Sequence, residues 1–181
     1  NLGGFDPKKD AVPYADLSEI DRWILNETAD LIDVCTRAYE DYEFHRVFQK
    51  CNEFCVVQLS ALYCDILKDR LYCSGHGSEL RRSAQTAQWQ VASVLIGVLA
   101  PVLVFTSDEA FAYLDSEGLG SVHLSGFPEA AEEWRQPQLA AKWKKLFEVR
   151  SEVLMALEDA RQVKKAVRSA LEAQVVLAVK D

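Results

Sequence analysis

The residue types that most often carry catalysis are few in this sequence, and they are scattered along it. None of the three histidines, His45, His76 and His123, lies in a zinc-protease or nucleophile-elbow motif. Cys73 and His76 have the spacing of two zinc ligands, but no second Cys/His pair with matching spacing accompanies them. No glycine-rich phosphate loop follows a predicted strand. The sequence therefore indicates neither an active site nor a metal site.

Basic and aromatic side chains gather instead around a turn between two predicted helices. They are Lys68, Arg70, Tyr72, His76, Arg81 and Arg82. Because residues 73–78 contain two glycines and join the two helix ends, we expect the four cations to cluster beside the turn. These cations could bind RNA phosphates, and the two rings could stack on unpaired bases. Alternatively, the cations on the first helix could bind its last carbonyl groups, a purely structural role.

A second row of cations lies along the first of these helices. At 100° per residue, Arg46, Lys50 and Lys68 fall within about 40° of one another on a regular α-helix. Such a row could follow the backbone of a polyanion. It could equally be the solvent-exposed face of a helix in a bundle, because charged residues usually occupy that face.

Apolar periodicity predicts the helices that position these side chains. The longest covers residues 44–72, which contain neither Gly nor Pro. Its apolar residues recur in steps of four and three, and the predicted buried stripe is Phe44, Phe48, Cys51, Cys55, Leu59, Leu62 and Ile66. An earlier helix should begin near Asp16 or Ser18, with an acidic residue three positions later as capping partner, and should run to residue 39.

Two further helices follow in the predicted bundle. The first should cover residues 79–100, with Ser78 as its N-cap and Pro101 as its end. Residues 106–109 (TSDE) have the pattern of a capping box and should begin a short helix.

The remainder of the chain is predicted to be less regular. A connector with several glycines could include a short strand at residues 121–124. Pro137 suits the first turn of another long helix over residues 138–167. Residues 173–179 are rich in valine and predict a strand, which would pair either with residues 121–124 or with a strand outside this sequence.

The predicted fold is therefore mainly α, with a bundle of four or five helices followed by a small α/β appendage. We expect the bundle in residues 1–116, an irregular connector in residues 117–137, and a long helix with a short strand in residues 138–181. A chain of 181 residues, of which 49% are hydrophobic, can bury a core of this kind.

Charge is distributed unevenly along the chain. The formal net charge of −8 argues against a protein that coats nucleic acid without regard to sequence. Acidic residues dominate the stretch 10–43, whereas basic residues dominate the stretch 143–169. Any contact with RNA must therefore be local.

The sequence carries no sign of export or membrane insertion. The longest apolar run, residues 91–105, is too short to cross a membrane, and the first ten residues are unlike a signal peptide. The five cysteines are an odd number, and Cys51 and Cys55 lie on a predicted apolar stripe, which favours reduced thiols over a disulfide framework. We expect a cytoplasmic protein without a membrane partner.

Five strings occur in a fixed order along the chain. They are DRWIL at residues 21–25, YEFH at 42–45, YCDILKDRLY at 63–72, RRSAQTA at 81–87 and LAPVLVFTSDEA at 99–110. Together they resemble the anticodon-binding helical domain of bacterial isoleucyl-tRNA synthetases. The strings ALEDAR at 156–161 and ALEAQVV at 170–176 resemble the segment that follows this bundle in the family. The resemblance covers nearly the whole chain and favours the isoleucyl enzymes over their valyl and leucyl relatives.

The resemblance implies a domain that holds the anticodon stem-loop of tRNA(Ile), while a separate catalytic domain uses ATP and Mg²⁺ to activate isoleucine. It implies no cofactor, no catalytic residue and no DNA partner for this portion. The candidate RNA contacts are Arg46, Lys50, Lys68, Arg70, Tyr72, Arg81 and Arg82. Trp23 and Asp108 also match the family, and we interpret them as a core ring and an acid at a helix start.

The chain also departs from the family. The ATP-site signatures H-I-G-H and K-M-S-K-S are absent, so we expect no aminoacylation by this chain alone. The family has a further helix before the equivalent of residues 1–7, and a glycine-containing turn where residues 166–170 read AVRSA. No zinc-binding cysteine module follows. We therefore interpret the chain as a C-terminal portion of a larger synthetase, whose remaining domains are its partners.

Other interpretations stay open from sequence. The chain could be the same domain of a valyl- or leucyl-tRNA synthetase. It could also be a helical scaffold that binds protein partners through its acid-rich first helix. A free-standing enzyme is disfavoured, because no nucleophile–base pair or metal set can be assembled.

Overall fold

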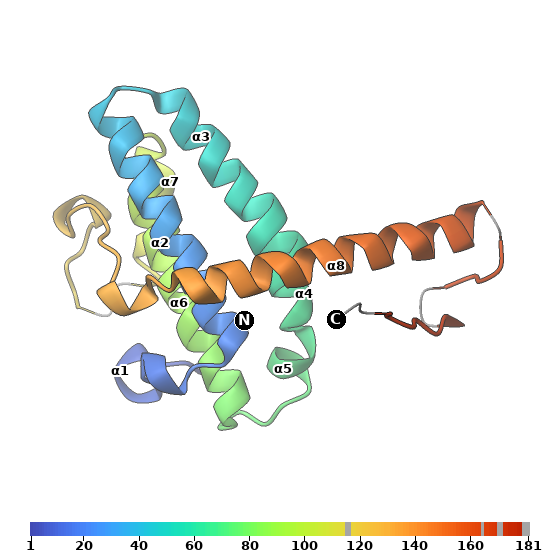
Figure 1. Ribbon diagram of the computed structural model, residues 1–181. Helices are drawn as coiled ribbons and strands as arrows, with labels where there is room; N and C mark the ends of the chain where they lie inside the picture. The colour runs from blue at the N-terminus through green and yellow to red at the C-terminus, as the bar shows by residue number, and fades with distance from the viewer. Residues whose placement is uncertain (115–116, 164, 170–171, 179–181) are drawn as a thin grey trace. The chain divides into compact units, whose positions relative to one another are not determined.

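Helices account for most of the described chain in the computed structural model (Figure 1). The described residues are 1–114, 117–163, 165–169 and 172–178. The chain divides into two compact units, Asn1–Gln136 and Pro137–Asp181. The mainly α fold predicted from the sequence is confirmed. The predicted boundary at residues 116–117 stays a prediction, and residues 115–116 lie outside the described residues.

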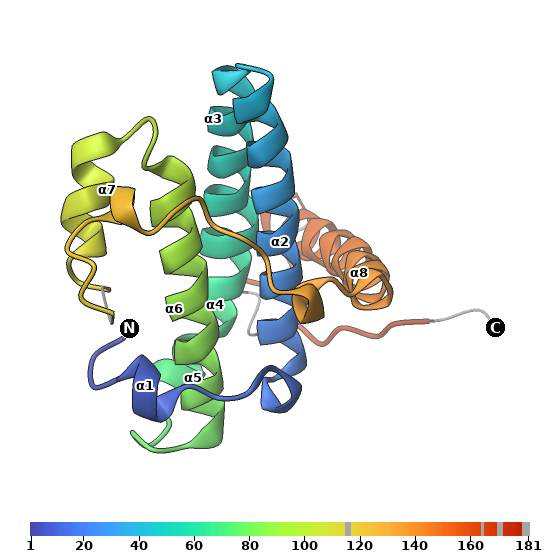
Figure 2. The ribbon, with the colours of Figure 1, turned by 90° about the vertical axis from the view of Figure 1, so that its left-hand side faces the viewer.

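Long helical segments run side by side in the first unit (Figure 2). They are α2 (Glu19–Glu40), α6 (Glu79–Leu99), and a segment made of α3 (Phe44–Glu53), the π-helical η2 (Phe54–Tyr63), α4 (Cys64–Ile66) and α5 (Lys68–Tyr72). Helix α2 packs against both of its long neighbours. The shorter elements are α1 (Pro7–Asp10), η1 (Tyr14–Asp16), α7 (Val104–Phe111), η3 (Val122–Leu124) and η4 (Glu132–Trp134).

The core of the first unit lies between these long segments. Trp23, Ile24 and Leu31 of α2 are buried, which confirms Trp23 as a core ring. Helix α6 contributes the small buried residues Ala84 and Ala87, which let the backbones of α2 and α6 approach closely. Removing this apolar surface from water is the main force that holds the bundle together.

The third helix begins at the predicted residue and ends one residue before the predicted residue 100, but one predicted cap is wrong. Helix α6 begins after Ser78, whose Oγ accepts a hydrogen bond from the Arg81 backbone N–H, and it ends at Leu99 before Pro101. Helix α2 begins after Ser18, yet the Ser18 side chain does not cap it. Its Oγ accepts a hydrogen bond from Arg70 Nη2 at 3.3 Å instead. A tertiary partner has replaced the predicted local one.

The buried stripe of residues 44–72 differs from the predicted stripe. Phe44, Phe48 and Ile66 are 49%, 69% and 43% exposed. The side chains that are buried are Val47, Cys51, Phe54, Leu62, Tyr63, Leu67 and Leu71. This stripe begins in the same steps of four and three, so periodicity alone could not choose between the two. The i→i+5 bonding of a π-helix also winds fewer degrees per residue, which shifts the phase across η2. For that reason the 100° geometry that aligned Lys68 with Arg46 does not hold.

The segment after α6 also differs from the prediction. Helix α7 begins at Val104 without a side-chain cap, so the capping box predicted at residues 106–109 is wrong. Asp108 lies inside the helix, where its Oδ1 accepts hydrogen bonds from Ser121 Oγ at 2.6 Å and from the Val122 N–H at 3.1 Å. Residues 122–124 form a 3₁₀ turn, so the strand predicted at 121–124 is wrong too. Asp108 therefore anchors the connector, where the sequence suggested a helix start.

The second unit consists of α8 (Pro137–Gln162) and the chain that follows it. Pro137 lies in the first turn as predicted, but the helix ends five residues before the predicted residue 167. Residues 172–177 line an apolar hollow of about 560 Å³ against α8. The described residues 172–178 form no strand. The predicted α/β appendage is therefore not confirmed, because a strand needs a paired neighbour and the described residues offer none. Residue 179 of the predicted strand lies outside the described residues.

Candidate nucleic-acid interface

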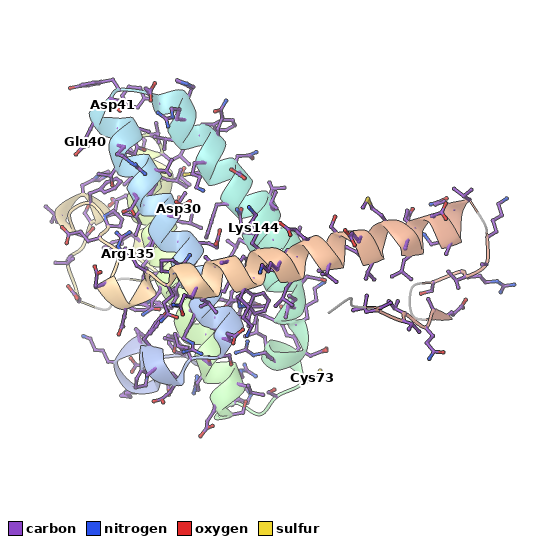
Figure 3. All side chains as sticks on the ribbon, viewed as in Figure 1. Asp30, Glu40, Asp41, Cys73, Arg135 and Lys144 are labelled. Carbon is purple, nitrogen blue, oxygen red and sulfur yellow. The ribbon has the colours of Figure 1, made fainter. Side chains whose placement is uncertain are left out.

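The basic residues predicted to cluster lie at one end of the first unit. We call this region, residues 68–82, the α5–α6 corner; it comprises α5, the turn 73–78 and the first turn of α6. Figure 3 shows Cys73 on this turn, at the opposite end of the bundle from Glu40 and Asp41 at the end of α2. The four cations predicted to flank the turn thus lie at the end of the bundle away from Glu40 and Asp41.

Arg70 is turned into the fold. Its Nη2 lies 2.6 Å from Asp21 Oδ2, and its Nη1 lies 3.1 Å from Asp21 Oδ1, so the pair is bidentate. The same guanidinium donates to the Leu80 carbonyl from Nη2 at 2.7 Å and from Nε at 3.2 Å. Only 15% of the side chain is exposed. The alternative that cations here bind carbonyl groups is therefore observed for Arg70, although the carbonyl belongs to the next helix.

Asp21 is the centre of a buried polar network that the sequence analysis missed. Its side chain is 0% exposed, and it also accepts hydrogen bonds from Tyr63 Oη at 2.7 Å and Ser83 Oγ at 2.5 Å. Burial, followed by the charge and hydrogen bond of Asp21, raises the pKa of Tyr63 well above its ordinary value. The phenol therefore stays neutral and remains a donor. An acid in the first turn of an apolar helix was the available signal, but it also fits an exposed helix start.

Arg81 is half-buried, the Arg82 side chain is only 19% exposed, and both form hydrogen bonds within the protein. Arg82 Nη1 donates to the Gly4 carbonyl at 3.0 Å, and Arg82 Nη2 lies 3.3 Å from Asp10 Oδ1. Arg81 Nη1 donates to the Ser74 carbonyl across the turn at 3.4 Å. These contacts hold α1 and the turn against α6. Arg82 Nη1 also donates to Gln85 Oε1 at 2.9 Å, and Arg81 Nε is buried, so only some of the five N–H donors of each guanidinium remain for a ligand.

Among the basic and aromatic residues of the corner, Lys68, Tyr72 and His76 have exposed side chains. Lys68 forms a surface ion pair with Asp65 at 2.7 Å, and the hydrogen bond and charge of Asp65 raise the pKa of Lys68. The Tyr72 ring is 69% exposed, and its hydroxyl donates to Asn1 Oδ1 at 2.8 Å. His76 is exposed on the turn. An exposed ring beside an exposed cation is the arrangement that unpaired nucleotides require.

Two further lysines lie near the corner and were not singled out from the sequence. Lys8 and Lys9 belong to α1, which packs against α6. Lys9 pairs with Asp6 at 3.0 Å and stays 80% exposed. Their distance from residue 68 in the sequence hid this proximity. Acidic residues accompany the cations throughout the corner, so its net charge is smaller than the list of cations suggests.

Arg46 and Lys50 lie on α3, outside the corner. Arg46 forms an exposed ion pair with Glu43. Lys50 Nζ lies 2.6 Å from Asp30 Oδ2 of α2. Burial disfavours the charge of Lys50, but the hydrogen bond and charge of Asp30 outweigh it and raise the pKa of Lys50. The structure therefore separates the predicted RNA contacts into the corner and a pair on α3.

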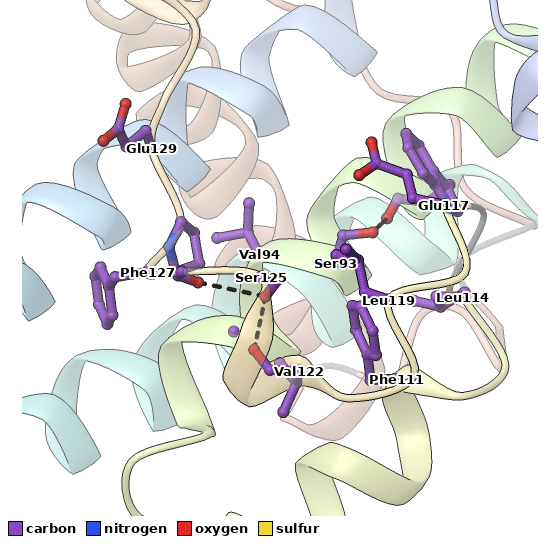
Figure 4. Close-up of a pocket in the computed structure, with 14 residues that line it drawn as sticks. Ser93, Val94, Phe111, Leu114, Glu117, Leu119, Val122, Ser125, Phe127 and Glu129 are labelled. Carbon is purple, nitrogen blue, oxygen red and sulfur yellow. Dashed lines mark hydrogen bonds between the residues drawn. The ribbon is translucent and has the colours of Figure 1, made fainter.

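A cavity of about 680 Å³ lies elsewhere in the first unit (Figure 4). Its walls include Val94, Phe111 and Val122. The described residues that line it include Glu117 and Glu129 but no Lys or Arg. A phosphate would find no cation there, so the cavity is not part of the candidate interface. Within the described residues, no group of three or more His, Cys, Asp or Glu side chains could hold a metal ion. No described helix is long and apolar enough to span a membrane.

The match to a family model assigns this helical chain to a class of proteins, the tRNA ligases. The model of the anticodon-binding domain of tRNA ligase matches residues 21–177, and the chain belongs to this family. The resemblance found in the sequence strings is thereby confirmed.

Curated relatives narrow the family further. The chain is 47% identical over 178 residues to an isoleucine–tRNA ligase of Desulfitobacterium hafniense, a match that covers 98% of this chain. It is 46% identical over 164 residues to the isoleucine–tRNA ligase of Moorella thermoacetica, covering 90% of this chain. It is 43% identical over 178 residues to that of Geobacter sulfurreducens, covering 98% of this chain. The chain spans 18–19% of the length of these relatives.

Proposed function

We propose that this chain binds the anticodon stem-loop of tRNA(Ile) as one domain of an isoleucine–tRNA ligase. The observation that carries the proposal is the family match over residues 21–177, together with the isoleucine–tRNA ligases named above at 43–47% identity. Valyl or leucyl identity is the alternative that the named relatives disfavour.

The α5–α6 corner is the proposed contact surface. Lys68, Arg81 and Arg82 would bind phosphates, and Lys8 and Lys9 would extend this contact along α1. The exposed Tyr72 ring would stack on an unpaired base. Arg46 and Lys50 would form a second contact on α3, separate from the corner. The overall charge of −8 makes a local, salt-sensitive contact the favourable arrangement.

The chemistry of the parent ligase would lie outside this chain. ATP and Mg²⁺ would serve a separate catalytic domain, and residues 1–181 would be inactive alone. The other domains of the parent and tRNA(Ile) are the proposed partners in the cytoplasm, with no role for DNA or a membrane. The bundle in residues 1–116, the connector in residues 117–137 and the junction region in residues 138–181 are the proposed functional divisions.

Binding to two RNA stem-loops tests this proposal. The chain would be titrated into labelled anticodon stem-loops of tRNA(Ile) and tRNA(Val), each at 50 and 200 mM salt. We expect tighter and salt-sensitive binding of the isoleucine stem-loop. Equal binding of both would contradict the selectivity for tRNA(Ile), and absence of binding at 50 mM salt would contradict the proposed function.

A further inference from the structure

We infer that Asp21 is a positioning residue for the α5–α6 corner, and that Arg70 acts with it inside the fold and does not contact RNA. This inference rests on the proposed function of the corner. Its basis is the convergence of donors from η2, α5 and α6 on one carboxylate that is 0% exposed. Asp21 is thus the point at which the elements carrying the corner meet α2.

The network fixes the direction in which the RNA-binding side chains leave the protein. Ser83 follows Arg82 directly, so the Ser83–Asp21 bond of 2.5 Å sets the rotation of α6 at this level. Arg70 lies two residues before Tyr72, so its bidentate pair sets the rotation of α5 in the same way. Buried hydrogen bonds of this kind hold surface groups in a fixed geometry.

Arg70 also closes the corner from the inside. It reaches from α5 to the Leu80 carbonyl in the first turn of α6, while Arg81 reaches back to the Ser74 carbonyl. The turn 73–78 is therefore bridged in both directions, which keeps the two helix ends at a constant separation. The protein surface that a stem-loop would bind is therefore preformed, which lowers the entropic cost of ordering the protein on binding.

Direct contact between Arg70 and RNA would require the pair to open. Opening would leave Asp21 buried without its cation, and an uncompensated buried charge is strongly unfavourable. RNA phosphates can instead reach Lys68, whose side chain is 65% exposed and whose partner Asp65 is 56% exposed. Arg70 is therefore a largely buried cation and Lys68 an exposed one, although they are only two residues apart in the sequence.

The two roles of Arg70 predict opposite effects for Asp21→Asn. This substitution removes one negative charge and releases Arg70 from its partner. If Arg70 bound RNA, the variant would bind more tightly. If Asp21 positions the corner, the variant should bind more weakly although its net charge has become less negative. The matched control is Asp65→Asn, which makes the same charge change at the surface and releases Lys68.

The experiment measures affinity of the full 181-residue chain for the tRNA(Ile) anticodon stem-loop by fluorescence anisotropy between 50 and 200 mM salt. Thermal unfolding followed by circular dichroism identifies a temperature at which every variant is folded, and binding is measured at that temperature. We expect Asp65→Asn to tighten binding at low salt and to steepen the slope of log Kd against log salt by up to about one unit. We expect Asp21→Asn to flatten this slope by about one to two units, as Arg81 and Arg82 lose their phosphates.

Each outcome bears on one proposal. Unchanged or tighter binding by folded Asp21→Asn would overturn the positioning role. Absence of binding by the unsubstituted chain would instead overturn the proposed function. If Asp21→Asn does not fold, Arg70→Lys decides, because it keeps the charge but cannot make the bidentate pair and reach Leu80 together. Weaker binding with a flatter salt slope by folded Arg70→Lys supports positioning. An unchanged salt slope is the result expected of a simple phosphate contact, because the charge is kept, and it overturns the positioning role.

Discussion

Replacing Arg70 with Met should destabilise the first unit far more than replacing Lys68 with Met, although the two ion pairs have nearly equal lengths. Arg70 Nη2 lies 2.6 Å from Asp21 Oδ2, and Lys68 Nζ lies 2.7 Å from Asp65 Oδ1. The difference lies in their surroundings. The Asp21 side chain is 0% exposed and Asp65 is 56% exposed. Water can rehydrate Asp65 once its partner is lost, but it cannot reach Asp21.

The size of the effect follows from burial. Removing one partner of a buried ion pair costs about 3–5 kcal/mol, because the remaining charge stays desolvated. An exposed pair contributes less than about 1 kcal/mol. The whole unfolding free energy of a domain is only about 5–15 kcal/mol. With a urea dependence of about 2 kcal/mol per molar, Arg70→Met should lower the unfolding midpoint by about 2 M, and Lys68→Met by less than about 0.5 M.

Urea unfolding followed by circular dichroism measures both variants. The double variant Arg70→Met with Asp21→Asn provides a further check. It removes the orphaned charge while its amide oxygen can still accept the hydrogen bond of Tyr63, so it should recover much of the lost stability. Equal midpoints for the two single variants would refute the reasoning, since burial would then make no difference to the ion pair.

Two further predictions concern stability elsewhere in the first unit. Tyr42 has a φ of 57° at the end of α2, where Glu43 N–H donates to the Ala38 carbonyl at 2.7 Å, and its ring is 80% exposed. Tyr42→Gly should raise the unfolding free energy, measured by urea unfolding, by about 0.5–1 kcal/mol. Glycine removes the steric cost of a left-handed backbone, and the greater entropy of the unfolded chain offsets part of that gain. Tyr42→Ala is its control, and an equal gain there would contradict the backbone explanation. Glu27 is partly buried, and burial, followed by the charge of Asp30, raises the pKa of Glu27. A raised pKa in the folded state contributes stability at low pH that is lost as pH rises. Glu27→Gln should therefore stabilise the fold at pH 7 but not at pH 4, and an equal shift in the urea midpoint at both pH values would contradict this cause.

Much of the bundle could be predicted because its signals are local. Helix α6 was located by Ser78 before it and Pro101 after it, and both act within one helical turn. The turn 73–78 was located by its glycines. It joins α5, which carries Lys68, to α6, which carries Arg81 and Arg82, and the two helices are in contact. The family strings extended the same reasoning to the whole domain.

Errors arose where a local signal had two solutions. In the segment 44–72, stripes through Phe48 and through Val47 fit the same periodicity, and packing against α2 chose Val47. The π-helical hydrogen bonding of η2 then altered the phase. The valines of residues 173–178 favour a strand, but a strand forms only with a paired neighbour, and none lies among the described residues.

The sequence by itself determined where the long helices of the first unit lie and which cations flank the turn 73–78. Only the tertiary structure decided that Arg70 faces inward while Lys68 faces the solvent. Both residues are cations on one short helix, and their local sequence signals are alike. Arg70 differs because Asp21, 49 residues away in the chain, meets it in a site that excludes water. Burial of a charge depends on every element packed around it, so local patterns cannot determine it.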